Sequence, residues 1–251
     1  MSTTGTQPRV EVFPDREALG RAAGDDIAAE LRRRLARQDG VRMILAAAPS
    51  QLETLERLRT AEGVDWSRVT AFHMDEYVGL PPNAPQRFGN WLKGALFDHV
   101  PLGNVHLLDP GSDPAEALRQ YADELAAAPI DVVVLGIGVN GHLAFNDPPD
   151  ADLADPQPVR VVELAEASRR QQVDDECFAR VEDVPRTAVT LTVPRLLDAG
   201  RLFCVVPGAA KAAAVRSAVT DPIGPDCPAT ALRRHPDCTL YLDKESAAHV
   251  G

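Results

Sequence analysis

Long apolar segments are missing from this sequence of 251 residues, and no run approaches the ~20 residues that a membrane-spanning helix requires. Residues 1–8 are polar and lack the basic-then-apolar profile of a secretion signal. Cysteine is scarce, and its four positions show neither CxxC spacing nor the framework of a disulfide-rich domain. These absences are typical of free thiols in a reducing compartment, so we expect a cytoplasmic protein without a membrane partner.

Basic residues are outnumbered in the sequence, with 26 lysines and arginines against 37 acidic residues and a net charge of -11. Such a surface repels nucleic acids and anionic lipids in general, although a local basic pocket can still hold an anion. We therefore expect no nucleic-acid partner. The hydrophobic content of 45% is that of an ordinary globular protein, and a chain of this length can bury one large core or two small ones.

Short apolar runs alternate with amphipathic stretches along the chain. We expect strands at Val10–Phe13, Val41–Ala47, Val69–His73, Val105–Leu108, Ile130–Gly136, Val159–Leu164, Ala188–Val193, Arg201–Val206 and Cys238–Leu242. We expect helices at Asp15–Arg37, Ser50–Glu62, Gln86–Phe97, Asp113–Ala127, Ala165–Cys177 and Ala209–Val219. This alternation predicts an α/β fold with a doubly wound, mostly parallel, Rossmann-like sheet and helices on both faces. The most apolar strand, Ile130–Gly136, is predicted to be central.

Local signals mark some of the predicted boundaries. Ser50 and Glu53 form a capping-box pattern at the start of one helix, with Gly63 at its end. Asp113–Glu116 repeats the pattern, with a proline at the favoured first helical position. Residues 146–158 are rich in proline and aspartate, but strand–helix alternation resumes directly after them, so we predict an active-site loop there and one domain over 1–251.

Three predicted strand ends carry polar residues, and ligands of open α/β sheets bind beyond such ends. Asp75 and Glu76 follow one strand, and they are either solvated loop acids or a buried base whose raised pKa suits removal of a carbon-bound proton. Asn140-Gly141 is a hairpin-turn signal, but a proline-broken loop follows it. His142 lies among glycines and acids there, which favours a functional role, whereas the other histidines are expected to be structural.

His73, Asp75 and Glu76 are residue types that can bind a metal ion. On a strand, His73 and Asp75 share a face opposite Glu76, and no second cluster at ligand spacing supports them. We therefore expect neither a metal nor another cofactor.

Two segments resemble the glucosamine-6-phosphate deaminase family: MDEYVGLP at Met74–Pro81 and GIGVNGHLAFNDP at Gly136–Pro148. The resemblance continues through Ala188–Val193, Lys211 and the stretch from Leu232 to Pro236, so it covers most of the chain in order. The related 6-phosphogluconolactonases share the fold but show a DER-type acidic motif and a GHTASLF-type histidine motif, which this sequence lacks.

The resemblance implies a reaction that opens a pyranose ring, isomerises the aldose to a ketose and releases ammonia without a cofactor. It makes Asp75 the base that moves the carbon-bound proton and His142 the group that assists ring opening. Asp147 takes the place of a family glutamate that orients the histidine, and Asn140 the place of an aspartate. An amide cannot ionise, so Asn140 cannot favour the protonated imidazole as a carboxylate would.

Substrate-binding positions also follow from the resemblance. They are Ala47, Ala48, Ser50, Gln51, Glu76, Gly138, Gly141, Ala144, Arg87, Arg170 and Lys211. The loop after the second strand is Gly/Ser/Thr-rich in relatives, but here it holds three alanines and Pro49, which has no N–H donor. A phosphate-binding arginine of relatives falls within Asp174–Glu176. Phosphate anchoring is therefore expected to be rebuilt, with Lys211, Arg87, Arg169 or Arg170 as the available cations, or relinquished.

The sequence thus predicts a deaminase and isomerase, formally a hydrolase, that acts on glucosamine 6-phosphate or a related amino sugar or sugar phosphate. A 6-phosphogluconolactonase-like hydrolase and a non-catalytic sugar-phosphate-binding protein are the alternatives. Sugar-responsive regulators carry a helix-turn-helix before this kind of domain, and only a short polar stretch precedes the first predicted strand. A homo-oligomer is possible, since relatives include hexamers and monomers.

Overall fold

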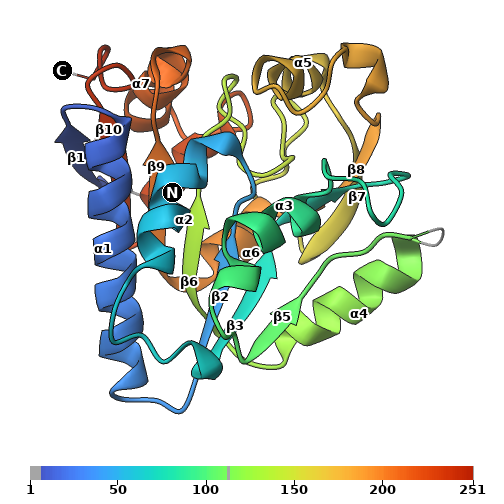
Figure 1. The fold of residues 1–251 in the computed structure, drawn as a ribbon. Coiled ribbons are helices and arrows are strands. Elements are labelled where there is room, and N and C mark those ends of the chain that lie inside the picture. The colour runs from blue at the N-terminus through green and yellow to red at the C-terminus, as the bar shows by residue number, and fades with distance from the viewer. Residues whose placement is uncertain (1–6, 112–113, 251) are drawn as a thin grey trace.

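A computed structural model describes residues 7–111 and 114–250, and a seven-stranded parallel sheet forms its centre (Figure 1). The strands, in spatial order, are β1 (Arg9–Phe13), β10 (Cys238–Asp243), β9 (Ala199–Val206), β6 (Ile130–Leu135), β2 (Val41–Leu45), β3 (Val69–His73) and β5 (Asn104–His106). All neighbours pair in parallel, and the apolar strand β6 is the middle one. The predicted α/β fold with a mostly parallel sheet is confirmed.

Helices cover both faces of this sheet. The helices are α1 (Arg16–Leu35), α2 (Leu52–Arg59), α3 (Phe88–Ala95), α4 (Pro114–Ala126), α5 (Glu166–Asp174), α6 (Val193–Leu197) and α7 (Ala212–Thr220). Two buried clusters divide the strand residues by alternation, so that Met43 packs with α1, α2 and α3 while Ile44 packs with α4, α6 and α7. No helix in the described part of the chain is both long and apolar enough to cross a membrane.

A second sheet of three strands was not predicted. Asp75–Tyr77 is a strand, β4, which pairs antiparallel with β8 (Thr187–Leu191), and β8 pairs antiparallel with β7 (Val159–Glu163). The sequence predicted only that Asp75 and Glu76 follow a strand, because three residues carry too little periodicity to identify a strand of their own. The long-range pairing with β8 decides its conformation, and it places the candidate base on a fixed element.

The predicted capping box at Ser50 is wrong. Pro49–Gln51 form a 3₁₀ turn before α2, Ala48 occupies its N-cap position, and no side chain caps either segment. Glu53 instead accepts a hydrogen bond from Arg16 on α1 at 2.9 Å. The helix ends at Arg59, before Gly63. The other predicted box includes Asp113, which lies outside the described residues.

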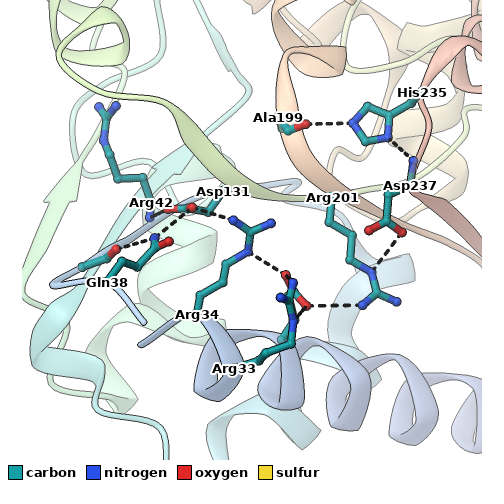
Figure 2. Close-up of polar contacts among 11 residues, drawn as sticks. Arg33, Arg34, Gln38, Arg42, Asp131, Ala199, Arg201, His235 and Asp237 are labelled. Atoms are coloured by element: carbon teal, nitrogen blue, oxygen red, sulfur yellow. Dashed lines mark hydrogen bonds and ion pairs between the residues drawn. The ribbon is translucent and has the colours of Figure 1, made fainter. Parts of the chain in front are cut away.

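The amino ends of the strands are tied to α1 by a network of charged residues (Figure 2). Glu30 is buried on α1 and forms ion pairs with Arg33, Arg34 and Arg201, the last of these from β9. Arg34 also contacts the Asp131 carboxylate of β6 at 2.7 Å. The network therefore connects the first helix to strands that follow it by about a hundred residues or more in the sequence.

Candidate active site

A cavity opens at the carboxyl ends of β2, β3 and β6, where open α/β sheets bind ligands. It brings together nine of the residues proposed from the sequence, namely Ala47, Ala48, Ser50, Gln51, Asp75, Gly138, His142, Ala144 and Lys211. Asp75 comes from β4 and His142 from the loop after β6, so two chemically reactive side chains from separate elements line the same space.

Asp75 is a buried carboxyl group at the start of β4. Burial raises its pKa well above the ordinary value, and the negative charge of Glu76 adds to this effect. The backbone of Asp75 is held by His73, whose Nδ1 lies 2.9 Å from the Asp75 carbonyl oxygen. Because the Leu108 N–H donates to His73 Nε2 at 2.8 Å, Nδ1 carries the proton and donates to Asp75.

His73 is therefore a structural residue. Burial lowers its pKa to about 4, so the ring is neutral and both of its nitrogens are engaged within the protein. Across the described residues, no group of three His, Cys, Asp or Glu side chains is arranged to hold a metal ion.

The inner nitrogen of His142 enters a compact polar network. Its Nδ1 lies 2.7 Å from Asn140 Oδ1, 3.0 Å from Ser168 Oγ and 3.2 Å from Asp147 Oδ1. Asn140 Nδ2 in turn donates to Asp147 Oδ1 at 3.0 Å, and the Ser168 hydroxyl donates to the same oxygen. Acceptors surround Nδ1, so it carries a proton, and Nε2 is the nitrogen left for a ligand.

Asp147 is ionised despite its burial. Burial alone would raise the pKa of Asp147. The hydrogen bond and charge of His142 lower it, hydrogen bonds from Asn140 and Ser168 add to this effect, and the resulting pKa is about 2. Its second oxygen accepts from the Ala165 N–H at 3.3 Å. The shorter side chain at this position thus contacts the imidazole directly.

A tight turn over residues 138–142 sets the position of the imidazole. The Gly141 N–H donates to the Gly138 carbonyl at 2.9 Å, and Gly141 has a φ of +85°, which favours glycine. A Cβ atom on Gly138 would lie 2.1 Å from Cε1 of His142, so the ring packs directly on this glycine. The turn signal in the sequence was real, but it closes a loop and not a hairpin.

Four of the proposed substrate-binding residues do not line the cavity. Glu76 accepts from the Phe88 and Gly89 N–H groups, both at 3.1 Å, and so anchors the start of α3. Arg87 lies 3.6 Å from Glu76 and 2.8 Å from Asp109, so its charge is neutralised. Arg170 is exposed and pairs with Glu166, and Gly141 serves the turn.

The sequence analysis missed the contribution of α5. Ser168, Gln171 and Gln172 are buried on this helix; the two glutamines line the cavity and the serine lies behind His142. These three residues share a face at helical spacing, but the helix is polar at nearly every position, so nothing in the sequence distinguishes this face from the others. Gln171 accepts from the Val139 N–H at 2.9 Å and fixes the loop before His142.

Lys211 supplies a cation at the end of the cavity near β9. Its side chain is buried, and burial lowers its pKa, although the charge of Asp175 acts in the opposite direction. No hydrogen bond or ion pair engages its ammonium group within the described residues, so it is available to an anionic ligand.

Comparison with known proteins identifies the family. Residues 14–241 match the model of glucosamine-6-phosphate isomerases/6-phosphogluconolactonase. The chain belongs to this family. A glucosamine-6-phosphate deaminase from Arthrobacter sp. (strain FB24) is 36% identical over 248 residues, which cover 96% of this chain and 92% of the relative. One from Bacillus cereus (strain G9842) is 37% identical over 184 residues, or 73% of this chain and 68% of the relative.

Solved structures agree with this assignment. A monomeric glucosamine-6-phosphate deaminase superimposes with a TM-score of 0.86 at 26% identity, covering 96% of this chain and 99% of that one. A 6-phosphogluconolactonase from Trypanosoma brucei gives a TM-score of 0.79 at 20% identity over 98% and 100% of the two chains, which shows the shared fold. The resemblance noted in the sequence is confirmed, and the chain is an enzyme of the deaminase family.

Proposed function

We propose that the chain converts a 2-amino sugar phosphate, with glucosamine 6-phosphate as the leading candidate, to the ketose phosphate and ammonia. The observation that carries this proposal is the shared cavity of Asp75 and His142, one a buried carboxyl group with a raised pKa and the other an imidazole with one free nitrogen. The names of the most similar relatives support the same reaction. A cytoplasmic location is also proposed, supported by the free thiols and the acidic composition.

Each step has a residue to perform it. His142 Nε2 exchanges a proton with the ring oxygen, which opens the pyranose to the aldehyde. Asp75 then removes the proton from C2 and returns it to C1, which leaves an imine at C2. Water adds to this imine, ammonia leaves, and the ketose remains, so one water molecule is consumed for each ammonia released. General acid–base steps of this kind each contribute about 10²–10⁴-fold to a rate.

The phosphate is assigned to the end of the cavity near Lys211. The ammonium group supplies the charge, and Ala47, Ala48 and Ser50 line the same cavity. The hydroxyl and backbone N–H groups of these residues are the proposed hydrogen-bond donors. Anchoring is then rebuilt around one lysine, since acids occupy Asp174–Glu176, where relatives place an arginine, and Arg87 is already paired.

An ammonia-release assay with glucosamine and its 6-phosphate tests the proposal. We expect turnover of the phosphorylated sugar by the wild-type protein and its loss in Asp75→Asn. Hydrolysis of 6-phosphogluconolactone is measured beside it. Lactone hydrolysis without ammonia release would favour the lactonase alternative, and binding of the sugar phosphate without either product would favour a non-catalytic binding protein.

A further inference from the structure

We infer that Gln172 is a catalytic residue whose side-chain amide donates a hydrogen bond to the substrate oxygen on C1. This inference rests on the proposed function, because the bond stabilises the negative charge that forms on that oxygen when Asp75 removes the C2 proton.

The orientation of the Gln172 amide is fixed. The Tyr77 hydroxyl donates to Gln172 Oε1 at 2.7 Å, so the NH₂ group points away from the tyrosine. Nε2 has no hydrogen-bond partner in the described residues, and it is not among the polar atoms sealed from solvent. Gln172 is 7% exposed and lines the same cavity as Asp75, so this free donor is within the part of the protein that the substrate would occupy.

Tyr77 is a rigid support for this donor. It is 1% exposed and packs against the rings of Phe88, Phe145 and Phe178. It also lies two residues after Asp75 on β4, so both side chains project from the same side of the strand. A donor held in this way needs little reorganisation during the reaction, which is the condition for effective stabilisation of an oxyanion.

No free cation near the cavity in the described residues remains to stabilise the C1 oxyanion, so a neutral donor is needed. Lys211 is the only lysine or arginine that lines the cavity among the described residues, and it is assigned to the phosphate. Arg87 is paired with Glu76 and Asp109. As Asp75 accepts the proton, its negative charge passes to the enolate, which forms in a buried site near Glu76, where an uncompensated negative charge is costly.

The electron movement defines the role of each group. The C2–H bond breaks and its proton passes to the Asp75 carboxylate, while its electron pair forms the C1=C2 bond. The C1=O electron pair moves onto the oxygen, which becomes the acceptor for Gln172. The proton then returns from Asp75 to C1 as the nitrogen lone pair forms the C2=N bond, and the iminium nitrogen gives up one of its protons to the C1 oxygen, which becomes a hydroxyl.

The neighbouring Gln171 shows what a purely structural glutamine looks like at this site. Its Oε1 accepts from the Val139 N–H at 2.9 Å, and its Nε2 lies 3.3 Å from Asp175 Oδ2. Both ends are engaged within the protein. Gln172 uses only its acceptor internally, and its donor remains free for a ligand.

Kinetics of Gln172→Met test the inference, because methionine has a similar shape but no donor. We expect kcat to fall about 10²–10³-fold, as for loss of one oxyanion donor, with little change in KM. Tyr77→Phe should lower kcat less, because the amide remains but loses its support. Glu166→Gln, on the exposed side of the same helix, is the control and should retain wild-type kcat. A kcat for Gln172→Met within threefold of wild type overturns the inference.

Binding measurements separate this inference from the proposed function. 5-Phosphoarabinonohydroxamate mimics the enediolate, whereas 2-amino-2-deoxyglucitol 6-phosphate has no carbonyl oxygen at C1. Gln172→Met should weaken the hydroxamate more than the alcohol, whose C1 hydroxyl is a weaker, neutral acceptor, and equal weakening of both ligands overturns the inference. If Gln172→Met fails to fold, Gln172→Glu keeps the acceptor for Tyr77 and should show at least the same selective loss. If the wild-type protein binds neither ligand and releases no ammonia, the proposed function itself fails.

Discussion

Asp75 is proposed to act in catalysis, and its burial also lowers the stability of the folded protein. Asp75→Asn should lower ammonia release about 10²–10⁴-fold, because an amide cannot accept the carbon-bound proton. The same change should raise the free energy of unfolding at neutral pH. The folded pKa of Asp75 lies above its ordinary value of 3.8, so ionisation penalises the folded wild-type protein as the pH rises above that value.

Denaturant unfolding of both proteins between pH 3 and pH 8 checks this prediction. The stability difference should vanish below the ordinary pKa of the carboxyl group, where Asp75 is protonated in both states. A variant that is inactive and also less stable at neutral pH would mean that Asp75 holds the fold and not the chemistry.

The amide at Asn140 gives a second prediction. Asn140→Asp would place a carboxylate beside both His142 and Asp147, at the present Asn140–Asp147 contact of 3.0 Å. The added negative charge favours the protonated imidazole, so the acidic limb of the pH–rate profile should move upward. Steady-state kinetics across pH measure the shift. A profile that stays in place contradicts the role of His142 in proton exchange.

Gly138 carries a third prediction, because it has no room for a side chain. A Cβ atom there would meet the imidazole of His142 at 2.1 Å, so Gly138→Ala should displace the ring and abolish most of the activity. Gly94→Ala on α3 is the matched control, since no atom lies within 4 Å of its added methyl group. The control should keep full activity and gain roughly 0.5–1 kcal/mol of stability. Activity assays and thermal unfolding of the two variants make the comparison.

At the scale of elements, the sequence predicted the strands that have a clear hydrophobic pattern. The central place of β6 followed from its apolar run, because the inner strands of the parallel sheet are buried on both faces, whereas the edge strands β1 and β5 are largely exposed. β4 was missed because its three residues are held by pairing with β8, far along the chain. Asp75 and His142 were found from motifs at strand ends, whereas Gln172 was missed because its function depends on a contact with Tyr77 that no local pattern shows.

The end of α5 carries an element-scale prediction. Glu176 follows the helix with a φ of +59°, a left-handed conformation that costs a residue with a side chain roughly 1–2 kcal/mol. Glu176→Gly should therefore raise the free energy of unfolding by about 1 kcal/mol, and Glu176→Ala, which keeps the steric penalty, should not. Denaturant unfolding of the two variants provides the test, and equal effects of glycine and alanine would contradict it.

At the scale of the whole molecule, chemistry and stability occupy opposite ends of the sheet. The cavity lies at the carboxyl ends of the strands, whereas Asp131 and Arg42 are second residues of β6 and β2 and belong to the network near the amino ends (Figure 2). The Arg42 N–H donates to the Asp131 carboxylate at 2.8 Å, and the same carboxylate binds α1 through Arg34. A change in the network should thus alter stability without changing the reacting groups.

Glu30→Gln tests this separation. The Glu30 side chain is 1% exposed and pairs with three arginines, of which Arg34 keeps Asp131 and Arg201 keeps Asp237. Loss of its charge weakens all three contacts and should cost roughly 1–3 kcal/mol. Burial opposes ionisation of Glu30, but the arginines outweigh it and hold the pKa below 4.5, so this stability is present above that pH and is lost as the pH falls through the folded value. Glu17→Gln, which removes an exposed pair with Arg21, should cost less than about 1 kcal/mol. Denaturant unfolding at pH 7 and under acid conditions, with kcat measured at pH 7, tests this prediction. Glu30→Gln should lose stability at pH 7, the difference from wild type should shrink in acid, and kcat should not change. A matching loss of kcat in the folded protein would show that the two ends of the sheet are coupled.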